Sequence, residues 1–354
     1  MKLALITDTH WGIRNDNIAF MDNSKEFLDE VFFPTIEREA IRTVVHLGDL
    51  VDRRKYINIR TASRLRKDFL EPLANGGYDV HFIAGNHDTY FKNTNSVNAL
   101  RELVVGKYKF RVYDQYPFES DFDGTKILML PWICDENREA SIHVIRNTPA
   151  QIVMGHLELQ GFEMFRGSIV SHGDDPSLFG RFDTVMSGHY HHRSSRGNIH
   201  YLGSHAEFTW SDYSDPRGFH IFDTETRNLT FVENPYRMFK KVWYNDIDDD
   251  FLNKQIDYKE FAGTMLKVIV TNKTNPYWFD KFIENLEQEN PLEIQIVEDH
   301  LNLALEDDAD IINEAESTLD IFKKYIDGVD AKNISKEKLE NKIVELYNEA
   351  LTIE

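Results

Sequence analysis

Short apolar runs that stop abruptly at polar residues recur along the first part of the chain. Residues 3–7, 43–47 and 80–84 show no polar alternation, which is typical of strands buried on both faces. Helical patterns separate these runs. One follows a cap at Asn23 or Ser24 and is kinked or ended by Pro34, and the other runs over residues 58–70 up to Pro72. This order predicts right-handed crossovers in a parallel sheet, with the connecting loops at one edge.

Further strands and helices continue the pattern. Asp123 and Gly124 form a turn signal, so residues 117–122 and 126–130 read as a hairpin. Helices are expected at residues 98–105 and 137–146, and strands at residues 110–113, 151–154, 184–187, 199–202, 219–223 and 229–232.

The pattern of apolar and polar residues changes in the last third of the chain. Strands at residues 265–271 and 293–297 flank a helix at residues 276–286, which indicates a small α/β unit. Beyond residue 300, one apolar stripe at helical spacing ends at Gly328, and another begins after a cap at Ser335. We therefore expect a main domain over residues 1–235, a small α/β capping domain over residues 236–300, and a helical segment over residues 301–354.

Composition narrows the class of protein. Apolar residues make up 41% of the 354 residues and charged residues 28%, as in a folded soluble protein. Cys134 is the only cysteine, so an intramolecular disulfide is excluded and a cysteine-rich zinc site is not expected. No apolar run approaches the roughly 18 residues of a membrane span. We expect a cytoplasmic protein with no membrane partner.

The negative charge is uneven. The formal net charge is −20, but residues 241–354 carry 27 acids and 12 bases, whereas residues 1–240 carry 33 acids and 28 bases. Residues 53–67 hold seven basic residues and no acid. This basic stretch is a candidate DNA-backbone contact, although a solvated helix face has the same composition. Its candidate DNA-binding residues are Arg53, Arg54, Lys55, Arg60, Arg64 and Lys67.

Ligand-type side chains follow five of the expected strands. They mix carboxylate, imidazole and amide groups, and they are Asp8, His10, Asp49, Asn86, His87, His156, His189 and His191. Such a set suits two divalent ions such as Mn²⁺, Fe²⁺ or Zn²⁺, since Mg²⁺ prefers fewer imidazoles and structural zinc prefers sulfur. Asp49 stands alone between paired ligands, so it is the expected bridging ligand.

Two adjacent divalent ions indicate phosphate-ester hydrolysis, because they stabilise both the attacking and the leaving oxygen. His87, next to Asn86, is then free to protonate the leaving oxygen. Asp88 is expected to fix the tautomer of His87 and raise its basicity. Any one of these polar residues alone is more often a cap or a turn, and only their repetition at five strand ends favours a metal site. The other histidines are treated as structural, with His192 the one left open.

Five segments carry a family resemblance: residues 8–10, 48–52, 85–88, 155–156 and 188–191. Together they resemble the motif set of the calcineurin-like metallophosphoesterases, whose fold is an α/β β-sandwich flanked by helices. Four of the chain's sequence motifs are similar to those of the SbcD-type DNA repair and recombination nucleases: residues 8–12, residues 48–53, Gly203-Ser204 and residues 216–219. Residues 130–132 and 155–159 are similar to the tailed-bacteriophage versions of these recombination endonucleases.

The resemblance implies specific roles. One metal ion would be bound by Asp8, His10, Asp49 and His191, and the other by Asp49, Asn86, His156 and His189, with His87 catalytic. The implied activity is Mn²⁺-dependent exonuclease and endonuclease cleavage of DNA, with Mg²⁺ as the alternative ion. Archaeal and eukaryotic members usually have a histidine where this chain has Asp52, so the role of that histidine is not carried over.

The resemblance also implies partners. Family members are homodimers that bind an ABC-type coiled-coil ATPase. The two helices expected in residues 301–354 would pack on the base of that coiled coil, or alternatively fold back onto the small domain. Two other functions stay open at this point. One is a phosphoesterase for a small substrate, and the other is a catalytically silent scaffold; the basic stretch and the filled ligand positions favour the nuclease over both.

Overall fold

Two six-stranded sheets form the main part of the fold. The structure, a computed structural model, describes residues 1–248, 251 and 256–298. In the first sheet the strands lie in the order β14 (Leu229–Glu233), β13 (Gly218–Asp223), β1 (Lys2–Ile6), β2 (Thr43–His46), β3 (Asp79–Ile83), β4 (Arg111–Tyr113). In the second they lie in the order β11 (Ser194–Arg196), β12 (Ile199–Tyr201), β10 (Thr184–Gly188), β7 (Ile152–His156), β6 (Thr125–Leu130), β5 (Phe118–Phe122).

The strands that carry the polar loops run parallel. β1 pairs with β2 and β2 with β3 in the first sheet, and β7 pairs with β10 in the second. The loops at their carboxyl ends therefore lie at one edge of each sheet, as the sequence predicted. The β-sandwich flanked by helices is confirmed.

The alternation of side chains along the strands builds two cores. Leu5 and Val45 belong to the core that includes Met154 of the second sheet. Their neighbour Ile6 points the other way and belongs to a core with Phe27. A strand with both faces buried in this way has no polar positions, which explains the unbroken apolar runs.

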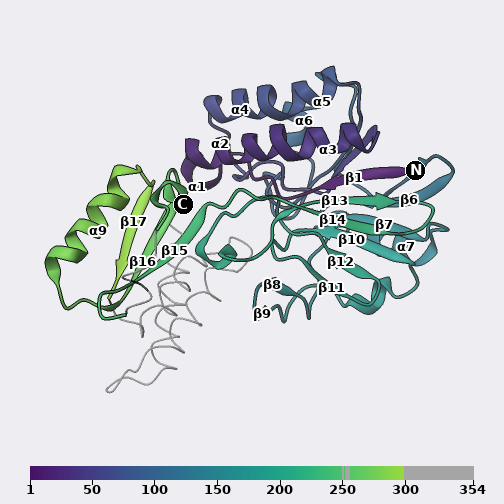
Figure 1. Cartoon of the computed structure of the whole chain (residues 1–354). Coiled ribbons are helices and arrows are strands. Elements are labelled where there is room, and N and C mark those ends of the chain that lie inside the picture. The colour runs from purple at the N-terminus through teal and green to yellow at the C-terminus, as the bar shows by residue number, and fades with distance from the viewer. Residues whose placement is uncertain (249–250, 252–255, 299–354) are drawn as a thin grey trace, which may run out of the picture. The chain divides into compact units, whose positions relative to one another are not determined.

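Helices cover the outer face of the first sheet (Figure 1). They are α2 (Ile18–Phe27), α3 (Phe33–Arg38), α4 (Ile59–Leu65), α5 (Glu71–Asn75) and α6 (Ala99–Leu103). The short α1 (Ile13–Asp16) packs on a separate cluster with Phe20 and Phe239, and α7 (Arg138–Asn147) follows β6 of the second sheet. Two predicted boundaries were wrong. The first helix begins after Asn17, whose side chain accepts the N–H of Ala19, and the second continues past Pro72 to Asn75. In both cases a wider π-type turn, at Leu28–Phe32 and at Arg66–Leu70, precedes the proline and frees the carbonyl group that its ring would meet.

A third sheet completes the described part of the chain. Its order is β15 (Phe239–Asn245), β16 (Met265–Asn272), β17 (Glu293–Val297), all parallel, with α9 (Pro276–Gln288) packed on it. A short hairpin of β8 (Glu163–Phe165) and β9 (Ser168–Ile169) lies apart from the large sheets. The sequence did not predict β15, because Lys240 and Lys241 interrupt its apolar pattern. The carboxylate of Glu207 accepts the N–H groups of Met238 and Phe239, which ties the start of this sheet to the main domain.

Met1–Glu298 form one compact unit, so the predicted boundary at residue 235 stays a prediction. The helices expected in residues 301–354 lie outside the described residues. Among the described residues, no helix is long and apolar enough to span a membrane.

Candidate metal centre

Backbone hydrogen bonds hold the loops after β1 and β2 together. The N–H of Asp8 donates to Gly48 O at 3.0 Å, and the N–H of His10 donates to Asp49 O at 3.1 Å. The N–H of His189, which follows β10 of the second sheet, donates to both carboxylate oxygens of Asp8 at 3.1 and 3.2 Å. The polar ends of both sheets thus meet at one place.

The ligand residues sit on a strained backbone. Asp8, His10, Asp49 and His189 all have positive φ angles, of 51°, 42°, 56° and 90°. Such conformations are costly for residues other than glycine, and they cluster at functional sites. They turn the side chains into the space between the sheets' ends.

Two glycines explain why the motifs place a glycine next to a ligand. A Cβ atom at Gly85 would lie 2.1 Å from Asp49 Oδ1, and one at Gly188 would lie 2.1 Å from Thr7 Oγ1. Any side chain there would push the loops apart. Neither glycine has a positive φ. These positions therefore need glycine because neighbouring segments approach too closely for a Cβ, and not because of the backbone conformation.

The first ligand group contains Asp8, His10 and His191. The Nε2 atoms of His10 and His191 are 3.0 Å apart, and His10 Nε2 lies 3.9 Å from Asp8 Oδ1. Asp49 Oδ2 lies 3.7 Å from the same His10 nitrogen. Their ligand atoms therefore converge on one point, as a divalent ion requires.

The second group contains Asn86, His156 and His189, and it also includes Asp49. Asn86 Oδ1 lies 3.0 Å from His156 Nε2 and 3.0 Å from His189 Nδ1. Asp49 Oδ2 lies 3.2 Å from His156 Nε2. The single carboxylate of Asp49 faces both groups, which is the geometry of a bridging ligand.

The donor set fits two divalent ions. Carboxylate oxygens, an amide oxygen and imidazole nitrogens face one another in a buried space. Burial alone would raise the pKa of Asp49, but the imidazoles of His156 and His87 hold it well below its usual range. Burial would lower the pKa of His156, but Asp49 raises it to about 9. The buried carboxylate of Asp49 therefore favours positive charge in its surroundings.

His87 lies at the same place but is partly exposed. Its backbone N–H donates to Asp49 Oδ1 at 2.8 Å, and its ring packs edge-on against His10 with centroids 4.8 Å apart. Its Nδ1 lies 2.5 Å from the carbonyl oxygen of Asp52. A backbone carbonyl group can only accept a hydrogen bond, so this contact assigns the proton of the neutral ring to Nδ1. Nε2 is then the nitrogen that can gain or lose a proton.

Asp88 has a different task from the one expected. Its Oδ1 accepts the N–H groups of Leu50 and Val51 at 2.9 and 3.2 Å, and its Oδ2 accepts those of Asp49 and Gly85 at 2.9 Å each. We expected Asp88 to orient the ring of His87. It instead fixes the loop that presents Asp49, and the ring contact comes from Asp52.

Asp52 is the residue whose role sequence reasoning left open. Its carboxylate lies 3.5 Å from His10 Nδ1, on the side of the ring opposite the metal-facing Nε2, while its carbonyl group meets His87. A carboxylate behind a histidine ligand fixes the ring orientation. The sequence feature that could have indicated this role is the position of Asp52 three residues after Asp49 in the same loop.

Glu158 lies behind His189 as Asp52 lies behind His10, because its carboxylate is 3.7 Å from His189 Nε2.

The basic stretch is largely engaged within the protein. Arg53 pairs with Asp16 at 2.8 Å, and Arg64 pairs with Asp22 at 2.8 Å and also with Asp68. Arg60 donates to the carbonyl oxygen of Asp16, and Arg54 donates to Thr89, one residue after Asp88. Lys55 and Lys67 are exposed. Arg53, Arg60 and Arg64 therefore tie α4 and the loop before it to the segment around α1 and α2, while Arg54 ties that loop to the segment after β3.

Four of the other histidines have structural surroundings. His192, left open by the sequence, lies 2.8 Å from Asp215 through Nδ1. Burial lowers the pKa values of His46, His205 and His220 to about 3, so these rings are neutral. None of the four belongs to a ligand group among the described residues.

Known proteins resemble this chain over more than half of its length. The family profile described as Calcineurin-like phosphoesterase matches residues 1–193. Exonuclease subunit 1 of Enterobacteria phage T4 is 32% identical over 356 residues, which is 99% of each chain. The SbcD subunit of the nuclease SbcCD from Staphylococcus epidermidis is 29% identical, covering 79% of this chain and 78% of that one, and its counterpart in Staphylococcus saprophyticus is 25% identical, covering 68% and 70%.

Proposed function

The chain belongs to the calcineurin-like phosphoesterases, and we propose that it is a DNA nuclease subunit of the SbcD type, cleaving phosphodiester bonds as exonuclease and endonuclease. The observation that carries this proposal is the match along the whole chain to a phage exonuclease subunit. A match over 99% of both chains includes the small domain and the C-terminal residues, whereas the family profile covers the phosphoesterase part alone.

We assign one divalent ion to Asp8, His10, Asp49 and His191, and the other to Asp49, Asn86, His156 and His189. When bound, the two ions supply a nucleophilic water and neutralise charge on the phosphate. We propose Mn²⁺ as the physiological ion, because a set that joins carboxylate and amide oxygens to several imidazoles suits it better than Mg²⁺.

His87 is the proposed proton donor to the leaving oxygen. Its Nδ1–H is held by the carbonyl oxygen of Asp52, so the proton given to the leaving oxygen would come from Nε2 of the imidazolium form. Its partly exposed ring can reach a bound phosphodiester, unlike the buried rings of His10 and His156. Asp88 acts through the Asp49 loop and is a positioning residue in this scheme.

DNA is the proposed substrate, with the basic stretch contacting its backbone. Arg54 and Lys55 lie in the loop next to Asp52, close to the metal centre, and Lys67 is exposed farther along the helical segment. Arg53 and Arg64 hold the underlying structure and contribute their positive charge less directly, because aspartates offset it, whereas the exposed Arg60 donates to the backbone carbonyl group of Asp16.

The proposed partners are a second copy of this chain and an ABC-type ATPase. The ATPase proposal follows from the likeness to SbcD subunits, and we place its contact in residues 301–354. Co-purification of the ATPase with the full chain and with a chain ending at residue 300 tests that placement; equal recovery with both would contradict it.

The function is tested by comparing two substrates. Linear duplex DNA and a chromogenic phosphodiester are each incubated with the purified chain and Mn²⁺. The proposal expects digestion of the DNA. Turnover of the small diester without any cleavage of DNA would instead identify a phosphoesterase for small substrates.

A further inference from the structure

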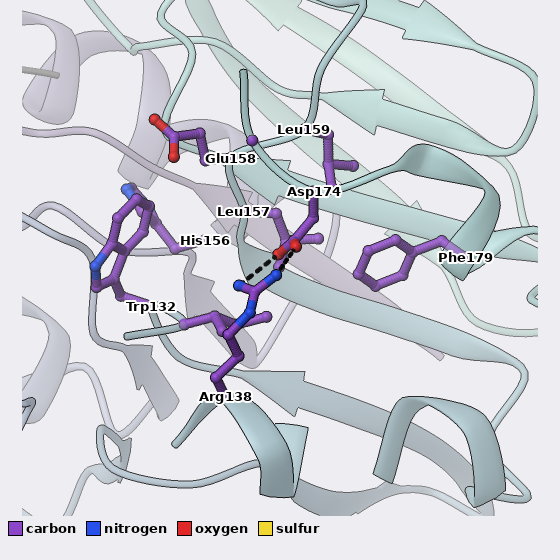
Figure 2. Close-up of a pocket in the computed structure, with 10 residues that line it drawn as sticks. Trp132, Arg138, His156, Leu157, Glu158, Leu159, Asp174 and Phe179 are labelled. Atoms are coloured by element: carbon purple, nitrogen blue, oxygen red, sulfur yellow. Dashed lines mark hydrogen bonds and ion pairs between the residues drawn. The ribbon is translucent and has the colours of Figure 1, made fainter. Parts of the chain in front are cut away.

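A pocket of about 260 Å³ opens directly beside the metal centre (Figure 2). His156, one of the proposed metal ligands, forms part of its wall together with Trp132, Arg138, Glu158, Asp174 and Phe179. The proposed nuclease mechanism gives no role to Trp132, Arg138, Asp174 or Phe179, whereas Glu158 also lies behind the metal ligand His189. An occupant of this pocket would lie next to the phosphate that is cleaved.

Trp132 presents a flat aromatic surface at the edge of the metal centre. It follows β6, the strand next to β7, and its ring centroid lies 5.1 Å from that of His189 and 6.1 Å from that of His156. Its backbone N–H donates to Ala84 O at 2.8 Å. Its carbonyl group accepts the side-chain amides of Asn95 at 2.8 Å and Asn137 at 3.0 Å. The backbone of Trp132 is therefore held on both sides, although the residue lies in a loop.

Polar groups lie across the pocket from the indole. In Figure 2, Trp132 and His156 stand on one side, and the fork of Arg138 meets the carboxylate of Asp174 in the middle, with Phe179 beyond. Arg138 is about half exposed and Asp174 is 18% exposed, so both can still offer atoms to a ligand. Together they provide donors and acceptors side by side.

The charged side chains that line the pocket favour a neutral occupant over a phosphate. Glu158 and Asp174 bring two carboxylates, against one guanidinium from Arg138. A neutral, flat group that carries both donors and acceptors fits this lining better. The volume is below the roughly 300–1,000 Å³ of pockets for drug-sized ligands, which suits a single ring system.

We propose that this pocket binds the base of a nucleotide adjoining the scissile phosphate, stacked on Trp132 with its polar edge toward Arg138 and Asp174. The proposal rests on the DNA nuclease function proposed above. Stacking on an aromatic side chain tolerates every base, because every base has a π-face. The pocket would thus orient the strand at the metal centre without demanding one sequence.

The test uses DNA duplexes in which one nucleotide beside a mapped cleavage site lacks its base. Separate duplexes carry the abasic unit on the 5′ side, the 3′ side or both sides. Wild-type protein should cleave at least one single-sided duplex on the order of 10-fold more slowly than intact DNA, as expected for one lost stacking contact. Trp132→Ala should cleave intact DNA more slowly by a similar factor and show no further loss with the abasic unit.

Two variants control the interpretation. Trp132→Phe keeps an aromatic face and should retain most of the sensitivity to the missing base. Phe118→Ala removes another exposed aromatic ring, on β5, and should remain as sensitive as the wild type. The metal content of each variant, measured directly, must equal that of the wild type.

The outcomes separate the two proposals. Equal cleavage of intact and abasic duplexes by the wild type would overturn the pocket assignment and leave the nuclease function standing. The same sensitivity to the abasic unit in Trp132→Ala as in the wild type would also overturn it. Failure to cleave any duplex with Mn²⁺ would overturn the nuclease function and, with it, the pocket assignment.

Discussion

Asp52 contacts two histidines of the metal centre with two different groups. Its carbonyl oxygen lies 2.5 Å from His87 Nδ1, and its carboxylate lies 3.5 Å from His10 Nδ1. A substitution of its side chain therefore affects the carboxylate behind His10 and leaves the carbonyl contact to His87 in place. The two functions of the residue can be separated by mutation.

Asp52→Asn should weaken metal binding more than it impairs the proton transfer by His87. Loss of a carboxylate behind a ligand histidine typically costs about 10–100-fold in metal affinity or activity. Activity should therefore recover as the Mn²⁺ concentration is raised. Titration of activity against Mn²⁺ measures this, and an unchanged midpoint with a lowered plateau would contradict it.

Asp88→Ala should destabilise the fold. The substitution leaves four backbone N–H groups of Gly85 and the Asp49 loop without their acceptor, and each buried orphan costs about 1–3 kcal/mol. We expect the free energy of unfolding in urea to fall by at least about 3 kcal/mol. Asp88→Asn keeps one acceptor oxygen and should lose less. A fully stable Asp88→Ala protein would contradict this role.

His220 should make stability depend on pH. Burial lowers the pKa of His220 to about 3 in the folded protein, whereas an unfolded histidine titrates near pH ~6.5. Below pH ~6.5 the unfolded chain binds a proton that the folded chain does not, so stability is lost as pH falls from ~6.5 toward 3. From about pH 7 to about pH 5, wild type should lose about 2 kcal/mol more than His220→Gln. Unfolding in urea at the two pH values measures this, and an equal loss of stability in wild type and His220→Gln would contradict it.

The exposed lysines of the basic stretch should contribute to the salt dependence of DNA binding. Each phosphate contact adds about 0.9 to the slope of log affinity against log salt concentration. Lys55→Ser with Lys67→Ser should therefore flatten the slope by up to about 2. Arg64→Ser serves as the contrast, because Arg64 pairs with Asp22 and Asp68 and its loss should lower the melting temperature instead. An unchanged slope in the double lysine variant would argue against the contact.

The sequence predicted the strands and their polar ends well, because a strand buried on both faces has no polar positions until it leaves the sheet. Residues 43–47 and 80–84 are examples, and both lead into ligand residues in the structure. Helix ends were predicted less well. Pro72 reads as a stop, but the π-type turn before it lets the helix continue to Asn75.

The partners of polar side chains could not be predicted, because they come from distant parts of the chain. Asp88 lies next to His87 in sequence, yet its carboxylate oxygens are used by the loop around Asp49, 39 residues earlier. Arg53 belongs to a run without acids, yet the fold brings Asp16 to it. Such pairings depend on the tertiary structure and not on local pattern.

The measurement that tests the account most directly is nucleotide release from linear duplex DNA by wild type and His87→Asn, with the metal content of both determined. Wild type should release nucleotides with Mn²⁺ and none with a chelator present. His87→Asn should bind the same two ions per chain and cleave about 10²–10⁴-fold more slowly, because it loses the proton donor. Wild type that leaves DNA intact with Mn²⁺, or His87→Asn with normal metal content and undiminished activity, would contradict the account.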